Sequence, residues 1–202
     1  MVNSLHTKVK REKGKHKKSA FIEVTLRSSA SYLKEIRELH SKYEVALRDK
    51  LLQDLKKLSP GTFEHFAKRL LEVYGFQDVK VTQVTNDGGI DGFGRLKVGL
   101  AFLNVAFQCK RWAKGSIGRP EIDKFRGATQ GEYEQGIFFT TARFAPGAEA
   151  VSFKSGAVPI VLIDGHGIIN LMVEKDFGVQ IDSLPIYTYA LDHFLSEDEN
   201  ER

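Results

Sequence analysis

Two short segments of the chain carry the side chains best suited to chemistry. The first is a glycine-rich run at residues 87–92 with the sequence DGGIDG, and the second is Gln108-Cys109-Lys110 in the next apolar run. A carboxylate, an amide oxygen and a lysine held together can bind a divalent cation and place a positive charge beside water and phosphate. These residue types therefore point to hydrolysis of phosphodiester bonds.

The spacing of these residues predicts how they are oriented. Along residues 103–109 the odd positions are all apolar, whereas Gln108 and Lys110 occupy even positions. Successive side chains of a strand point to opposite faces, so we expect Gln108 and Lys110 to emerge together, opposite the apolar stripe. The glycines around Asp91 permit backbone conformations closed to other residues and let Asp91 approach the neighbouring strand. Asp91 is the leading candidate for a metal ligand.

A third candidate lies upstream, in a helix that Ser59 and Pro60 are suited to begin. Glu64 shares a helical face with the apolar residues Ala67 and Leu71, which places its carboxylate at the edge of the buried side. A carboxylate buried without a partner is costly, so Glu64 would need a cation, a metal or hydrogen-bond donors. The alternative is that Glu64 reaches solvent, as glutamates at helix edges usually do.

Further short motifs follow these candidates along the chain. In order, the motifs are Phe63-Glu64, Leu70-Leu71, Gly75-Phe76, Asp87 to Gly92, Gln108 to Arg111, Phe125-x-Gly127, Thr140-Thr141, Phe144, Ala148 and Leu162 to Gly165. Each motif is weak alone. In this order and with these gaps, the chain resembles the catalytic domain of Mrr-type restriction endonucleases, which belong to the PD-(D/E)xK nuclease superfamily. The resemblance extends from about residue 60 to about residue 180.

The resemblance implies a role for each candidate residue. Asp91 would be the acidic metal ligand, Gln108 and Lys110 the Q-x-K variant of the E-x-K motif, and Glu64 the carboxylate of the helix. Cys109 would lend its backbone carbonyl oxygen to the metal, and not its thiol. The implied activity is metal-dependent cleavage of DNA in restriction of foreign or modified DNA, with Mg²⁺ as cofactor and Mn²⁺ as a substitute.

The glutamine lowers the negative charge of such a site. Glu64 and Asp91 supply two formal negative charges, where an E-x-K motif would bring the total to three. We therefore expect weaker metal binding that depends more on DNA phosphate, which suits Mg²⁺ because it keeps several waters and takes one or two carboxylates. Two other functions stay open: a non-catalytic DNA-binding protein on the same fold, and a nuclease acting on junctions or RNA.

The remaining patterns alternate between strands and helices. Strands are expected at residues 79–84, within 96–110 after a turn, and at 136–141 and 159–163; helices are expected at 120–131, 146–155 and 168–175. This alternation predicts an α/β fold in which a central mixed β-sheet is flanked by helices. It agrees with the restriction-endonuclease-like three-layer sandwich that the resemblance implies.

The chain divides into four parts. Residues 1–30 form a basic arm that we expect to be disordered, 31–58 a long amphipathic helix, 59–190 the nuclease domain, and 191–202 an acidic tail. The apolar stripe of the helix either packs on its own domain, which is the preferred interpretation, or pairs with a second copy in a homodimer. The first 58 residues look too short and too charged for a winged-helix recognition domain, so a separate specificity partner is also considered.

Composition favours an anionic partner such as DNA. The 202 residues carry a formal net charge of +4, and the sequence pI is about 9.0. The candidates for DNA contacts are Lys8, Lys10, Arg11, Lys13, Arg111, Arg119, Lys124 and Arg126. For the arm, a solvated tail without a binding role is the alternative.

Two classes of protein are disfavoured by the sequence. The single cysteine rules out an internal disulfide. No stretch approaches the ~18 consecutive apolar residues of a membrane-spanning helix, and the basic start lacks the apolar core of a secretion signal. We therefore expect a cytoplasmic protein that does not act at a membrane.

Overall fold

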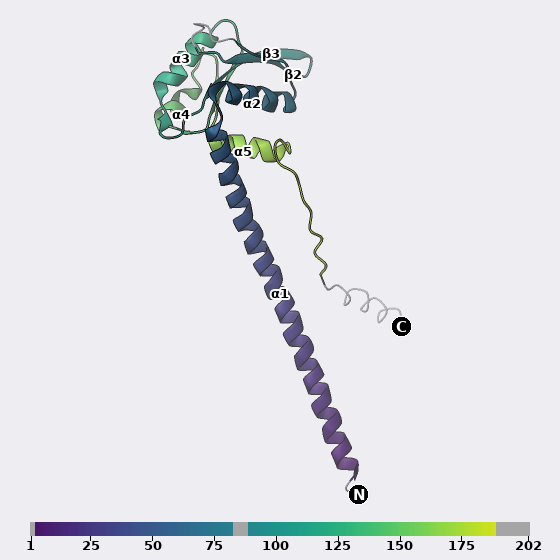
Figure 1. The fold of residues 1–202 in the computed structure, drawn as a ribbon. Coiled ribbons are helices and arrows are strands. Elements are labelled where there is room, and N and C mark those ends of the chain that lie inside the picture. Colours follow the sequence, from purple (N-terminus) through teal and green to yellow (C-terminus); the bar gives the residue numbers. More distant parts are fainter. Residues whose placement is uncertain (1–2, 83–88, 189–202) are drawn as a thin grey trace.

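The computed structural model describes residues 3–82 and 89–188, and the side chains from residue 29 onward. Its helices are α1 (Asn3–Lys57), α2 (Pro60–Val73), α3 (Arg119–Thr129), α4 (Pro146–Ser152) and α5 (Gly165–Glu174). Its strands are β1 (Phe76–Val81), β2 (Gly92–Val98), β3 (Ala101–Lys110), β4 (Ser116–Ile117), β5 (Gln135–Thr140), β6 (Arg143–Phe144) and β7 (Ile160–Ile163). Figure 1 shows a single α/β domain from which α1 extends.

The centre of the domain is a five-stranded mixed sheet in the order β1-β2-β3-β5-β7. The pairs β1–β2 and β2–β3 are antiparallel, whereas β3–β5 and β5–β7 are parallel. Strands β4 and β6 form a separate two-stranded parallel pair. The strand that carries Gln108 and Lys110 is therefore the middle strand of the main sheet, where both edges are paired.

Helices cover both faces of this sheet. One apolar cluster joins the end of α1 with α2, α5 and residues such as Phe107 and Phe139. The other joins α3 and α4 with residues such as Ala106 and Phe138. Neighbouring residues of β3 and of β5 thus enter opposite clusters, as the period of two in a strand requires. The expected three-layer α/β sandwich with a central mixed sheet is confirmed.

Helix α1 begins at Asn3 and not near Ser31, so the prediction of a disordered arm over residues 1–30 is wrong from residue 3 onward. The first 58 residues contain no proline and one glycine, and they are rich in lysine, arginine, glutamate and leucine. These residues lose little side-chain freedom in a helix and therefore favour helix continuation.

Among the side chains of α1 that the structure describes, from residue 29 onward, those of the last turns pack on the domain. Leu52 and Leu55 are buried in the cluster shared with α2 and α5, whereas Tyr32, Leu39 and Tyr43 are exposed. Figure 1 shows the rest of α1 extending away from the sandwich. The preferred interpretation of the apolar stripe, packing on its own domain, thus holds for the C-terminal end of the helix.

Other boundaries differ in smaller ways. Strand β1 begins at Phe76 instead of residue 79, because its pairing with β2 includes a bulge between Gln77 and Lys80 that hides the alternation. Strands β2, β4 and β6 are not among the strands expected from the sequence. The acidic tail at 191–202 lies outside the described residues. None of the described helices is both long enough and apolar enough to cross a membrane.

Candidate active site

Asp91 lies immediately before β2 and is tied to both neighbouring strands. Its carbonyl oxygen accepts a hydrogen bond from the Thr82 amide at 2.9 Å, and its own amide donates to the Phe107 carbonyl oxygen at 3.0 Å. Its carboxylate oxygen Oδ2 accepts a hydrogen bond from the Cys109 amide at 2.7 Å. These contacts hold the carboxylate against β3, where the sequence had placed it.

The approach of Asp91 to β3 requires glycine on either side. A Cβ atom at Gly92 would lie 2.2 Å from Cζ of Phe107 and 2.4 Å from the Lys80 carbonyl oxygen. Gly89 has a φ of +104°, and a Cβ atom there would lie 2.7 Å from Nε2 of Gln108. Any larger residue at these two positions would displace the strands or the glutamine.

Gln108 and Lys110 lie on β3 beside Asp91. The antiparallel register pairs Gly92 with Phe107. Extended by one residue, the same register places Asp91 opposite Gln108. Gln108 is buried, with 5% of its surface exposed. Lys110 is half-buried, and its Nζ lies 3.0 Å from Oε2 of Glu121 in the first turn of α3. Both side chains are on the α3 face of the sheet, as alternation predicted.

Glu64 on α2 is electrostatically coupled to this group. Burial raises the pKa of the Glu64 carboxyl, and the negative charge of Asp91 raises it further, whereas His65 lowers it. The pKa of the Cys109 thiol is raised well above its usual range, first by burial and then by the charges of Asp91 and Glu64. The thiol therefore stays neutral, and a cysteine nucleophile is disfavoured.

The repulsion between the negative charges of Glu64 and Asp91 bears on whether a metal ion fits at this site. Two carboxylates that disfavour each other's charge in a partly buried place are stabilised by a shared cation. Among the described residues, no group of three or more histidine, cysteine, aspartate or glutamate side chains is arranged to hold a metal ion. The side chains of Glu64, Asp91 and Gln108 offer carboxylate and amide oxygens, which suit Mg²⁺ or Mn²⁺ better than Zn²⁺.

Glu121 is the polar residue of this site that the sequence analysis missed. It is the third residue of α3, a position in the first turn where carboxylates are stabilised by the helix dipole. That local preference explains why a glutamate can stand there. Its approach to Lys110 depends on how α3 packs across β3, and no short-range pattern encodes this packing.

One predicted DNA contact is excluded by burial. Arg126 on α3 exposes 6% of its surface. Its guanidinium donates to the carbonyl oxygens of Val158 at 3.2 Å and Ser152 at 3.2 Å and to that of Val151, and it pairs with Asp123 at 3.0 Å. Arg126 therefore connects α3 to α4 and to the chain before β7, and it is removed from the DNA-contacting set.

Arg111 also has a structural contact. Its Nη1 donates to the carbonyl oxygen of Lys56 at 2.8 Å, and its buried Nε has no hydrogen-bond partner in the described part of the chain. This contact joins the C-terminal end of α1 to the residue that follows β3. It favours a role for Arg111 in anchoring α1 over a contact with DNA.

The other predicted DNA contacts are differently placed. Arg119 and Lys124 are both exposed on α3, and Arg119 forms an ion pair with Asp123 at 2.9 Å. They remain on the surface of the helix that also carries Glu121. The side chains of Lys8, Lys10, Arg11 and Lys13 lie outside the described residues.

Comparison with known proteins agrees with this arrangement. Residues 55–172 match the family model Mrr_cat, described as a restriction endonuclease. The type IV methyl-directed restriction enzyme EcoKMrr of Escherichia coli K12 is 34% identical over 168 residues, which are 80% of this chain and 51% of that protein. The chain therefore spans about half the length of this curated relative.

Two solved structures of restriction endonucleases align with this chain, and the first of them supports the fold. The DNA modification-dependent restriction endonuclease AspBHI aligns with a TM-score of 0.53 and 24% identity over 65% of this chain and 36% of that one. The MspJI restriction endonuclease in complex with a 27-mer oligonucleotide aligns with a TM-score of 0.46 and 19% identity over 78% of this chain and 35% of that one. By its family match and its identity to EcoKMrr, the chain belongs to the Mrr family of restriction endonuclease domains.

Proposed function

We propose that this protein is a metal-dependent DNA endonuclease that acts in restriction of foreign or modified DNA. The observation that carries the proposal is the placement of Asp91 against β3, where its carboxylate accepts a hydrogen bond from the Cys109 amide, between Gln108 and Lys110 in sequence, in a chain of the Mrr family. A carboxylate, an amide and a lysine on adjoining strands give the donor set and the positive charge that phosphodiester hydrolysis needs.

Each residue has a part in this proposal. Asp91, Glu64, Gln108 and the backbone carbonyl of Cys109 would hold Mg²⁺, or Mn²⁺ in its place. When bound, the ion supplies a Lewis acid for the scissile phosphate and lowers the pKa of a bound water. Lys110 orients the attacking water and offsets the charge that develops on the phosphate. Glu121 holds the Lys110 ammonium at 3.0 Å and thereby limits where it can point.

The charge of the site supports a dependence on DNA for metal binding. Glu64 and Asp91 are its two anionic ligand candidates, and Gln108 adds no charge. Phosphate oxygens of the substrate would complete the coordination of Mg²⁺, which commonly binds through one or two carboxylates and substrate phosphates. We expect the affinity for Mg²⁺ to be measurably higher with DNA bound than without it.

The relatives suggest modified DNA as the substrate. EcoKMrr is named a methyl-directed restriction enzyme. By analogy, we propose that this protein cleaves methylated DNA and that it does so in the cytoplasm. A separate specificity partner is part of the proposal. A non-catalytic DNA-binding protein and a nuclease for junctions or RNA are the alternatives.

Cleavage assays with matched variants test this proposal. Unmodified and methylated plasmids are incubated with the purified protein in Mg²⁺, in Mn²⁺ and in chelator. We expect cleavage only with metal, and its loss in Asp91→Ala and in Lys110→Ala because each removes a group from the reacting centre.

Two substitutions at exposed positions serve as controls. Asp49→Ala on α1 and Lys97→Ala on β2 remove the same charges away from the site and should leave cleavage unchanged. Full activity of Asp91→Ala or Lys110→Ala would refute the assignment. DNA binding without cleavage in every condition would favour the non-catalytic alternative, and cleavage of junctions or RNA alone would favour the other.

A further inference from the structure

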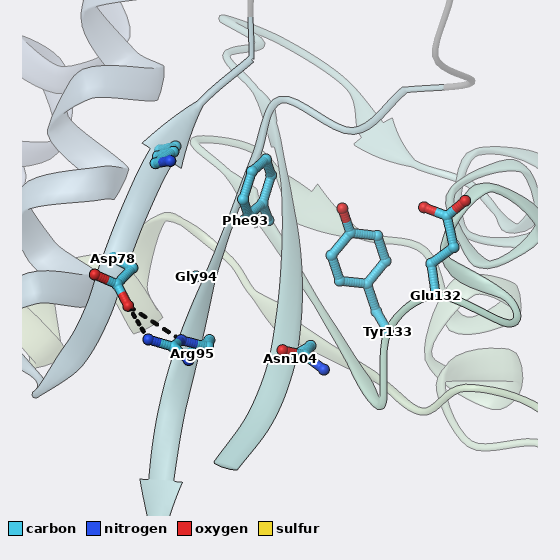
Figure 2. A pocket seen from close by; sticks show the side chains of 8 residues that line it. Asp78, Phe93, Gly94, Arg95, Asn104, Glu132 and Tyr133 are labelled. Atoms are coloured by element: carbon cyan, nitrogen blue, oxygen red, sulfur yellow. Dashed lines mark hydrogen bonds and ion pairs between the residues drawn. The ribbon is translucent and has the colours of Figure 1, made fainter.

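A pocket lies on the α3 side of the sheet, the same side as Gln108 and Lys110 of the proposed active site. It has a volume of about 280 Å³ and is formed by β1, β2, β3 and the turn that follows α3. Figure 2 shows the rings of Phe93 and Tyr133 standing beside each other in it, with Asn104 below them on β3. Nothing in the proposed hydrolysis uses these residues.

The register relates this pocket to the active site. Phe93 pairs with Ala106 across β2 and β3, and side chains alternate along β3, so Asn104, Gln108 and Lys110 share one face. Asn104 and Gln108 are four residues apart, a separation of about 13 Å at ~3.3 Å per residue. A stacked DNA strand advances about 3.4 Å per nucleotide. One strand of DNA can therefore reach both places within about four nucleotides.

The two rings make a surface for a flat ligand. The ring centroids of Phe93 and Tyr133 are 6.4 Å apart and the rings are tilted by 44°. Both side chains are half-buried. Burial raises the pKa of the Tyr133 hydroxyl, and the neighbouring charge of Glu132 raises it further, so the hydroxyl remains a hydrogen-bond donor. Nucleobases stack on aromatic side chains through their π-faces.

The charges around the rings disfavour a phosphate. Lys80 and Arg95 contribute two positive charges, and Asp78 and Glu132 contribute two negative ones, so the formal charges of the lining cancel. Arg95 is bound to Asp78. A neutral planar ligand fits this balance better than an anion does. Carboxylates accept hydrogen bonds from the exocyclic amino group of cytosine, and asparagine pairs with adenine.

We propose that the pocket beside Phe93 and Tyr133 binds one unpaired nucleobase of the DNA strand that crosses the active site, with preference for a base that carries an exocyclic amino group. The inference rests on the proposed nuclease function, because it takes DNA as the ligand. The base must leave the stack of a duplex to expose its π-face, as it does for enzymes that extrude a base into a pocket. The pocket thereby senses a base a few nucleotides from the scissile phosphate.

Binding of short oligonucleotides tests the pocket without any cleavage. Fluorescence anisotropy in chelator measures the affinity of the whole protein for labelled dC and dT octamers and for an octamer of abasic residues. We expect wild type to bind the dC octamer about tenfold more tightly than the abasic octamer, because stacking contributes that much per base. Tyr133→Ala should lose this advantage and bind the abasic octamer as wild type does.

Matched variants separate stacking from other effects. Tyr133→Phe keeps the ring and should retain the preference for bases, and Tyr187→Ala removes an exposed tyrosine elsewhere and should change nothing. Glu132→Gln on the exposed turn should reduce the preference for dC over dT. Melting temperatures confirm that each variant is folded.

The outcomes distinguish this inference from the nuclease proposal. Equal affinity of wild type and folded Tyr133→Ala for the dC octamer would refute binding of a nucleobase in this pocket, even if the protein cleaves plasmid DNA. Equal binding of dC and abasic octamers by wild type, or no binding of either, would also refute it. Asp91→Ala should keep the base preference while it loses cleavage, so failure at one site is seen independently of the other.

Discussion

The Lys110 ammonium and the Glu121 carboxylate lie 3.0 Å apart between β3 and the first turn of α3. Both side chains are about one third exposed, with values of 30% and 32%. An ion pair that is partly open to solvent contributes little to stability. Its effect here is to restrict the position of a lysine that must meet the phosphate, so we expect Glu121 to act as a positioning residue.

Substitution of Glu121 should therefore alter rate more than binding. Glu121→Gln removes the charge that holds Lys110, and we expect the single-turnover rate of DNA cleavage to fall about tenfold, since small misplacements of reacting groups are costly. DNA affinity measured in Ca²⁺ should stay within twofold of wild type. Glu149→Gln, at an exposed place in the first turn of α4, is the control. An unchanged rate would show that Lys110 needs no such partner.

Glu64 predicts a dependence of stability on pH and on metal. Its pKa in the folded protein is raised above the usual value of 4.5 for a glutamate, first by burial and then by the charge of Asp91. The folded state therefore binds the proton of the Glu64 carboxyl more tightly than the unfolded state does. The stabilisation of the fold by this proton is full below pH 4.5 and is lost as the pH rises through the pKa of the folded state. At neutral pH the Glu64 charge opposes folding when no cation is present.

Thermal unfolding of Glu64→Gln measures this effect. We expect the variant to melt at a higher temperature than wild type at pH 7.5 in chelator, and at the same temperature at pH 3.5. Addition of Mg²⁺ should raise the melting temperature of wild type more than that of the variant, because the variant lacks one anionic ligand. Equal responses to Mg²⁺ would argue against Glu64 as a ligand.

At the scale of elements, the attachment of α3 depends on the buried guanidinium of Arg126. It donates to the carbonyl oxygens of Val158 and Ser152, and so it satisfies backbone groups of two neighbouring segments. We expect Arg126→Ala to lower the free energy of unfolding by about 3 kcal/mol, because buried acceptors lose their donor and a cavity remains. Urea denaturation measures this change.

Arg119→Ala on the same helix is the matched control. Arg119 is exposed and its ion pair with Asp123 is at the surface, so its loss should cost less than about 1 kcal/mol. The affinity of folded Arg126→Ala for DNA should equal that of wild type at low temperature. A selective loss of DNA affinity with unchanged stability would return Arg126 to the DNA-contacting residues.

At the scale of the whole molecule, α1 has an apolar stripe that its own domain leaves exposed. Tyr32, Ile36, Leu39 and Tyr43 are spaced by four, three and four residues, and they are 62%, 39%, 64% and 65% exposed. This spacing is that of a coiled-coil seam. Exposure of an apolar stripe to water does not stabilise a long helix, whereas packing of the stripe does. We therefore expect the stripe to pair with the same stripe of a second copy.

Sedimentation at several concentrations tests this homodimer. We expect wild type to dimerise, and the double substitution Leu39→Lys with Tyr43→Lys to yield monomers, because it places charges in the seam. Val45→Lys adds a charge at another exposed apolar residue of α1, 58% exposed and off the seam, and should leave the dimer intact. A monomeric wild type at working concentrations would reject the prediction.

The sequence by itself determined the fold class and the group around Asp91. Alternation along β3 places Gln108 and Lys110 on one face, and the glycines on either side of Asp91 allow the close approach that is observed. Both are short-range features, in which spacing along the chain dictates direction in space. The contributions of these residues to metal binding and catalysis stay predictions.

The tertiary structure alone decided which charged side chains meet a partner. Positive charge predicted a DNA contact for Arg126 as readily as for Lys124, yet one is buried under carbonyl groups and the other is exposed. The pairing of Lys110 with Glu121 and the pocket beside Tyr133 likewise join segments far apart in sequence. Such contacts depend on how helices pack across the sheet, and this packing reflects the sum of many weak apolar contacts that no local pattern contains.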